Sequence, residues 1–98
     1  MIKIMVVEKN PEIREIITAS FIYFIRQSSS EIIRIAKVET IEEAKRKIIS
    51  GFLPNAIIFE EKTPQAKKNN LASWIEQQEL AIPFLTFKAM KIPTPLFV

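Results

Sequence analysis

One short stretch, residues 54–64, constrains the fold of this chain more than any other. It contains the apolar run 56–59, which is bounded by Pro54 on one side and by Pro64 on the other. A short apolar run between turn residues is typical of a strand that is buried on both faces of a parallel sheet. The run ends abruptly at Glu60. Because open α/β sheets bind their ligands at the carboxyl ends of the strands, Glu60 is a candidate site residue.

Extended and helical patterns alternate along the rest of the chain. Apolar runs predict strands at residues 2–7, 32–38, 56–59 and 84–87, of which the last is expected to be buried like the third. Amphipathic periods predict helices at residues 11–26, 41–50 and 71–78. This alternation indicates an α/β domain with three α/β/α layers, in which a parallel sheet carries helices on both faces. Residues 1–98 are therefore expected to form a single domain.

The predicted helices have recognisable boundaries. Asn10 is a favourable N-cap before Pro11, Thr40 and Glu43 form a capping box, and Gly51 is placed to end the second helix in a left-handed turn. At 100° per residue, the inward face of the first helix is expected to hold Ile13, Ile16, Ile17, Ser20, Phe21 and Phe24. In the second helix the inward residues are expected to be Ile41, Ala44, Ile48 and Ile49.

Several residue types are missing, and their absence narrows the chemistry. The 98 residues include no Asp, His or Cys. This excludes disulfides, thiolate chemistry, an Asp-based triad and the usual zinc ligands, and neither a metal nor a cofactor is expected. No apolar run approaches the roughly 20 residues that cross a bilayer, and the N-terminus shows no signal-peptide pattern. We therefore expect a cytoplasmic location and no membrane partner.

The order and spacing of these segments resemble the receiver domain of bacterial two-component response regulators. The resemblance covers about residues 2–89 and rests on the runs 4–10, 42–51, 54–60 and 81–85, on Pro64, on Leu71, Ala72 and Ile75, and on Lys88-Ala89. It implies a flavodoxin-like sheet with the strand order 2-1-3-4. The tail has room for a short fifth strand at residues 93–98, and the family's fourth and fifth helices have no counterpart.

The positions that carry the family's chemistry have changed. The family holds Mg²⁺ with an acidic pair, which is Glu8 and Lys9 here, and it phosphorylates an Asp at the position of Glu60. The family's switch hydroxyl falls on Lys88, or on Thr86 after a two-residue shift. An ammonium does not ligate Mg²⁺, and the longer Glu side chain misplaces the acceptor oxygen. The resemblance therefore implies a degenerate phosphoacceptor pocket without a metal.

Lys9 admits two interpretations in this pocket. In the first, its ammonium replaces the metal and pairs with Glu60, with Glu8 or with both. In the second, all three side chains are solvated loop charges. A further alternative is that Glu60 mimics a phosphorylated Asp, although Lys9 would cancel much of that charge. These alternatives differ in one measurable quantity, the distance from the Lys9 ammonium to the two carboxylates.

The leading functional interpretation is a non-catalytic pseudo-receiver, a protein-interaction or signalling module that works without phosphorylation. Loss of the late helices would expose apolar surface, and such surface usually marks an interface. A protein partner or a homodimer is therefore expected. The candidate interface residues are Ile22, Ile25, Trp74, Leu96 and Phe97.

Two alternatives stay open. Lys62, Lys67 and Lys68 could form a nucleic-acid interface, but a net charge of +3 spread along the chain does not give the dense basic face typical of such proteins. An enzyme would use Glu60 as a general base, yet the sequence offers neither a nucleophile–base pair nor a glycine-rich phosphate cradle. Neither a nucleic acid nor catalysis is therefore the favoured expectation.

Overall fold

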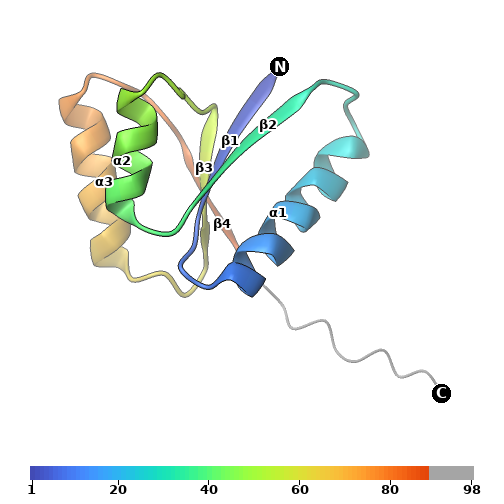
Figure 1. Ribbon diagram of the computed structural model, residues 1–98, viewed down its shortest axis with the longest axis horizontal. Helices are drawn as coiled ribbons and strands as arrows, with labels where there is room; N and C mark the ends of the chain where they lie inside the picture. The colour runs from blue at the N-terminus through green and yellow to red at the C-terminus, as the bar shows by residue number, and fades with distance from the viewer. Residues whose placement is uncertain (89–98) are drawn as a thin grey trace.

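The structure, a computed structural model, describes residues 1–88. Its elements follow in the order β1 (Ile2–Val7), α1 (Pro11–Arg26), β2 (Ile33–Val38), α2 (Ile41–Ile49), β3 (Ala56–Glu60), α3 (Gln65–Gln77) and β4 (Phe84–Phe87). All four strands run parallel in one sheet with the order β2-β1-β3-β4 (Figure 1). The predicted strand order is confirmed. The fifth strand predicted at residues 93–98 lies outside the described residues.

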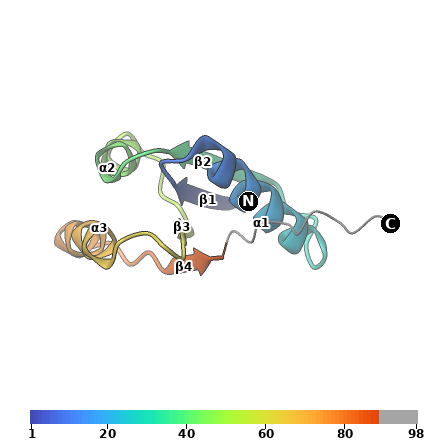
Figure 2. The same ribbon diagram turned by 90° about the horizontal axis from the view of Figure 1, so that it is seen from below.

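Helices cover both faces of this sheet. α1 lies on one face, and α2 and α3 lie on the other (Figure 1, Figure 2). One apolar cluster surrounds Phe59 and Leu71 beneath α2 and α3, and a second surrounds Ile17 and Ile58 beneath α1. This is the predicted three-layer, flavodoxin-like arrangement. Within residues 1–88 no helix corresponds to the fourth or fifth helix of the receiver fold.

The strand β3 lies in the middle of the layers, as the apolar run predicted. It pairs with β1 on one side and with β4 on the other, and all five of its residues are buried. A strand with helices over both faces has no solvent-exposed face. Its sequence therefore does not alternate between apolar and polar residues. Glu60 is the last residue of this strand and the one charged residue in it.

The helix ends follow the predicted caps. The Asn10 side chain accepts hydrogen bonds from the backbone amides of Glu12 and Ile13, and the Thr40 hydroxyl accepts one from the amide of Glu43. Gly51 has a φ of 109°, so it ends α2 in the left-handed region that favours glycine. These local signals fix where α1 and α2 enter the carboxyl edge of the sheet.

Three boundary and burial predictions were wrong. α3 begins at Gln65 rather than at Leu71, because residues 65–70 form exposed polar turns that carry no apolar period. β4 was expected to be buried, but Leu85 is 41% exposed and Thr86 is exposed. Among the described residues no strand pairs with the outer edge of β4, so it is an edge strand. Ile49 also points outward from α2.

The inward face of α1 differs from the predicted one. Ile17 and Phe21 are buried, and Ile13 and Ile25 pack against the same cluster. These residues follow one another at intervals of four, which is the narrow row that a single helix presents to a sheet. Phe24 is 65% exposed, Ile16 is 37% exposed and Ser20 is exposed, so the predicted inward positions of these three residues were wrong. Ile25 is partly buried against this cluster, and its assignment to an interface stays a prediction.

Candidate functional site

Three glutamates occupy neighbouring positions along the carboxyl edge of the sheet. The last residues in register on β2, β1 and β3 are Val38, Val7 and Phe59. The next residues along these strands are Glu39, Glu8 and Glu60. Adjacent strands lie about 4.8 Å apart, so the three residues start from neighbouring backbone positions. The topology thus brings together two predicted site residues, Glu8 and Glu60, and a third acid that the sequence interpretation missed.

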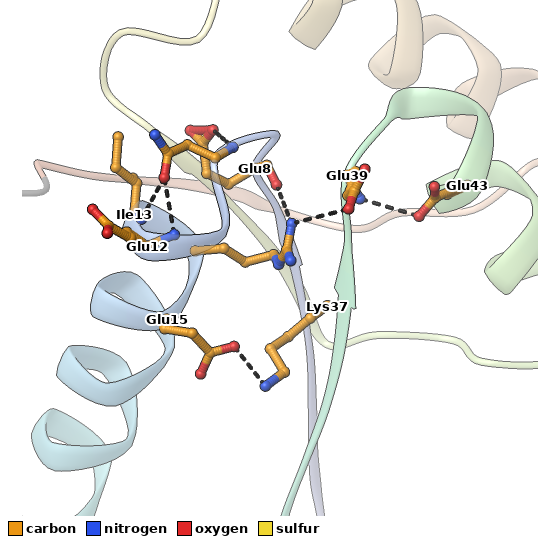
Figure 3. A network of polar contacts seen from close by, with 9 residues as sticks. Glu8, Glu12, Ile13, Glu15, Lys37, Glu39 and Glu43 are labelled. Atoms are coloured by element: carbon orange, nitrogen blue, oxygen red, sulfur yellow. Dashed lines mark hydrogen bonds and ion pairs between the residues drawn. The ribbon is translucent and has the colours of Figure 1, made fainter.

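Arg14 on α1 reaches this row of acids. Its Nη1 donates to the backbone carbonyl of Glu8 at 2.9 Å and lies 3.8 Å from Oε1 of Glu39. Lys37 of β2 makes a second ion pair with Glu15 of α1, with 2.8 Å between Nζ and Oε1 (Figure 3). Because Arg14 is mostly buried, its guanidinium ties the start of α1 to the ends of β1 and β2. Glu39 is the one acid of the row with a cationic partner among the described residues.

Glu60 is the most enclosed of these acids, with 6% of its surface exposed. Its Oε2 accepts a hydrogen bond from the backbone amide of Lys62. Within residues 1–88 no fully buried side-chain oxygen lacks a hydrogen-bond partner, and Oε1 of Glu60 accepts none. Glu60 thus keeps one oxygen without a hydrogen-bond partner among the described residues, and its side chain lines the surface hollow beside it.

That hollow has a volume of about 1210 Å³ and lies where the starts of α1, α2 and α3 meet the strand ends. Glu8, Lys9, Glu60 and Lys88 all line it, so the four residues predicted to form the degenerate pocket do meet in space. Its apolar lining includes Val7, Ile13, Ile16, Ile41 and Pro64. The site thus combines apolar walls with carboxylates at the point where the strand order reverses, which is where open α/β sheets bind ligands.

The ion pair predicted for Lys9 is not formed. None of the ion pairs in the described part of the chain involves Lys9, whose side chain is exposed. Glu60 instead binds its own loop through the Lys62 amide, and Oε2 of Glu8 accepts from the Asn10 amide at 2.9 Å. An exposed lysine gains little from an ion pair because ordering its long side chain opposes the Coulomb term. Lys9 therefore lines the hollow but does not replace the metal by direct pairing.

The other predicted residues are distributed over the molecule. Lys62 and Lys67 line the hollow, whereas Lys68 does not. Ile22 is half-buried on α1, and Trp74 is half-buried against the cluster beneath α2 and α3. Leu96 and Phe97 lie outside the described residues. Of the three lysines considered for a nucleic-acid interface, two therefore share the hollow with acids, and that interface stays a prediction.

A Mg²⁺ ion does not fit the donor set of this pocket. The metal prefers six oxygen ligands, and it usually takes carboxylates from more than one chain position. Here Lys9 stands where the resemblance places the second acid, and Glu39 is bound to Arg14. In residues 1–88 no group of three or more acids, histidines or cysteines is arranged to hold a metal ion.

Comparisons with family models, with curated proteins and with solved structures found no match. The fold and the position of the site therefore rest on the sheet order and on the register described above. No helix within the described range is both long and apolar enough to cross a membrane.

Glu39 and Arg14 are the site residues that sequence reasoning missed. A signal for Glu39 was present, because Val38-Glu39 repeats the pattern of Val7-Glu8 and Phe59-Glu60 at the end of a predicted strand. Arg14 carried no comparable signal. Its role depends on the angle at which α1 crosses β1 and β2, and that angle is a property of packing rather than of local sequence.

Proposed function

We propose that this chain is a non-catalytic receiver-like module that binds protein and acts without phosphorylation. The carboxyl edge of its sheet serves as a binding surface rather than as a phosphorylation centre. Partner binding and self-association are two forms of the same function, since both use surface that the described helices leave open. This proposal carries no reaction step.

One observation carries the proposal: the acid at the phosphoacceptor position is Glu60, and one of its oxygens is held by the Lys62 amide. The other oxygen, Oε1, accepts no hydrogen bond among the described residues, but the longer Glu side chain displaces it from the in-line position, and phosphoryl transfer also needs a metal that neutralises the developing charge. Lys9 stands in place of the second metal ligand. The pocket therefore keeps the position of a receiver site and lacks the groups for its chemistry.

Exposure to a small phosphoryl donor tests the first half of this proposal. Incubation with Mg²⁺ and acetyl phosphate, followed by an acid quench and intact-mass spectrometry, is expected to leave the mass unchanged. The matched variant carries both Lys9→Asp and Glu60→Asp, which restore the acidic pair and the acceptor. A phosphorylated wild-type chain would contradict the proposal. Phosphorylation of the double variant alone would show that these two positions account for the loss.

Self-association tests the second half. Tyr23 and Phe24 are 72% and 65% exposed on α1, and exposed aromatic side chains next to each other favour an interface. A homodimer is expected at a protein concentration of about 0.1 mM. At this concentration a dimer with a Kd of about 10 μM is mostly assembled. Size-exclusion chromatography with light scattering measures the mass directly. A monomer at this concentration would leave a different protein as the partner and would remove self-association from the proposal.

A further inference from the structure

Glu8 and Glu60 form the feature of the hollow that the proposed function leaves unexplained. They follow neighbouring residues in register on β1 and β3, and both line the hollow. Each accepts one backbone amide, and neither has an ion-pair partner among residues 1–88. Glu60 is buried and Glu8 is partly exposed, and a buried carboxylate is usually paired with a cation or bound to several donors, because burial removes its hydration. This pair of acids therefore has unused capacity to accept hydrogen bonds.

The geometry points to a specific occupant. We propose that the hollow binds an arginine side chain of a protein partner, with its guanidinium between Glu8 and Glu60. A guanidinium is planar and presents several N–H donors in a fixed fork, so it can bridge two carboxylates on adjacent strands. This inference rests on the proposed binding function and names the chemistry of the partner segment.

The walls of the hollow suit the rest of such a segment. Ile13 and Ile16 line it from α1, Ile41 from α2, and Pro64 from the loop before α3. These side chains can cover the methylene stem of an arginine and an apolar neighbour in the partner. A volume of about 1210 Å³ accommodates several side chains rather than one. The partner segment is thus an arginine flanked by apolar residues.

Four lysines also line the hollow, namely Lys9, Lys62, Lys67 and Lys88. All four are exposed, and none forms an ion pair within the described residues. Their positive charges repel a cation, so they lower the affinity of the hollow for an arginine side chain. Removing the nearest of them in sequence, Lys9, is expected to strengthen binding. Added salt is expected to weaken the contact with the acids.

A peptide titration tests the proposal on the full chain. The probe is the peptide acetyl-Ala-Leu-Arg-Leu-Ala-amide, and the control peptide carries citrulline, an uncharged analogue of arginine with nearly the same shape. Binding is followed by the amide chemical shifts of ¹⁵N-labelled protein. The arginine peptide is expected to shift the amides near Glu8, Glu60 and Lys62 and to bind at least tenfold more tightly than the citrulline peptide, since a hydrogen bond to a charged group is involved.

Matched variants locate the contact. Glu60→Gln and Glu8→Gln keep a side-chain oxygen that accepts the local backbone amide, so both variants are expected to fold. Each should lower the affinity for the arginine peptide about tenfold or more. Glu61→Gln is the control, because Glu61 is an exposed neighbour that does not line the hollow. Lys9→Gln should raise the affinity.

The outcomes separate this inference from the proposed function. Equal binding of the arginine and citrulline peptides, or binding unchanged by Glu60→Gln, would overturn the arginine site while leaving the binding module intact. Phosphorylation of the wild-type chain would overturn the proposed function itself. Loss of binding in Glu61→Gln as well would show that net charge, and not the Glu8–Glu60 pair, attracts the peptide, and this too would overturn the assignment.

Discussion

The two faces of the sheet differ in how completely helices cover them. Beneath α2 and α3 the described residues form a cluster of ten buried apolar side chains, whereas beneath α1 they form one of six. The aromatic pair of the larger cluster, Phe59 and Phe84, has ring centroids 5.1 Å apart. The pair beneath α1, Phe21 and Phe87, lies at 6.3 Å. The strands supply six side chains to the larger cluster and four to the smaller one, and the helices supply four and two, so strands and helices contribute equally to the difference.

This difference assigns separate roles to the two faces. Two helices over one face exclude water from its centre, where Phe59, Ile57 and Leu71 have no exposed surface. A single helix over the other face buries one row of side chains and leaves Tyr23 and Phe24 in contact with solvent. The α2–α3 face therefore holds the larger share of the buried apolar side chains. The α1 face keeps apolar surface that another chain can cover.

The largest expected effect is that of Phe59→Ala on the α2–α3 face. Phe59 is fully buried in the central strand, and truncation of such a residue costs about 4–5 kcal/mol because the rigid layers on both sides cannot collapse into the cavity. This is a large part of the roughly 5–15 kcal/mol that stabilises a domain. Urea denaturation followed by far-UV circular dichroism measures the loss. A cost below about 2 kcal/mol would show that this face is not the rigid one.

Phe21→Ala makes the same change on the α1 face. Phe21 is buried, but its neighbours on α1 are partly exposed and can move into the space that it leaves. The expected cost is about 3 kcal/mol, at the low end for a buried Phe. The same denaturation experiment applies, so the two variants form a matched pair. If Phe21→Ala destabilises the protein as much as Phe59→Ala, the two faces contribute equally and the comparison fails.

Sequence alone predicted the features of the fold that depend on local patterns. The unbroken apolar run before Glu60 identified the central strand, and the Asn10 and Thr40 caps located two helix starts. The start of α3 was predicted six residues too late, because residues 65–70 are polar and its first turns touch little of the core. Phe24 was misplaced because a helical period defines a face of the helix but not the strip of that face that meets the sheet.

The candidate site was predictable to a smaller extent. Glu8, Lys9, Glu60 and Lys88 were expected together because strand ends of a parallel sheet share one edge, and they do line one hollow. The Lys9 ion pair was wrong, since an exposed lysine gains little from pairing and the sequence does not show how exposed its side chain is. The volume of the hollow and the position of the Arg14 guanidinium depend on the packing of α1, which no local pattern specifies.

A smaller effect is expected from the helix caps. Asn10→Ala removes a side chain that accepts two amides, from Glu12 and Ile13, at the start of the helix that alone covers one face. Thr40→Ala removes a cap that accepts one amide, from Glu43, at the start of α2. Each change is expected to cost about 1 kcal/mol, with the larger loss at Asn10. Thermal or urea unfolding of the pair, side by side, measures the difference. If Thr40→Ala lowers the stability more than Asn10→Ala does, the protein depends less on the capping of α1 than on the capping of α2.

The smallest effect on stability, and the most informative one for function, is that of Phe24→Ser. Phe24 lies on the outer side of α1, so its replacement should change the free energy of unfolding by less than about 0.5 kcal/mol. If the α1 face is covered by a second chain, the same change should weaken dimerisation about tenfold, since burying a Phe contributes about 1.5–3 kcal/mol. Light scattering over a range of concentrations measures this shift.

Ile49→Ser is the matched control, because Ile49 is 73% exposed on α2 over the other face. It should leave both the stability and the dimerisation constant unchanged. If Ile49→Ser weakens the dimer and Phe24→Ser does not, the contact lies over α2, and the assignment of roles to the two faces is reversed. If both variants weaken it equally, exposed apolar surface drives a non-specific association. If Phe24→Ser alone weakens the dimer, the second chain contacts α1. This is the face of the sheet that a single helix covers, whereas two helices cover the opposite face.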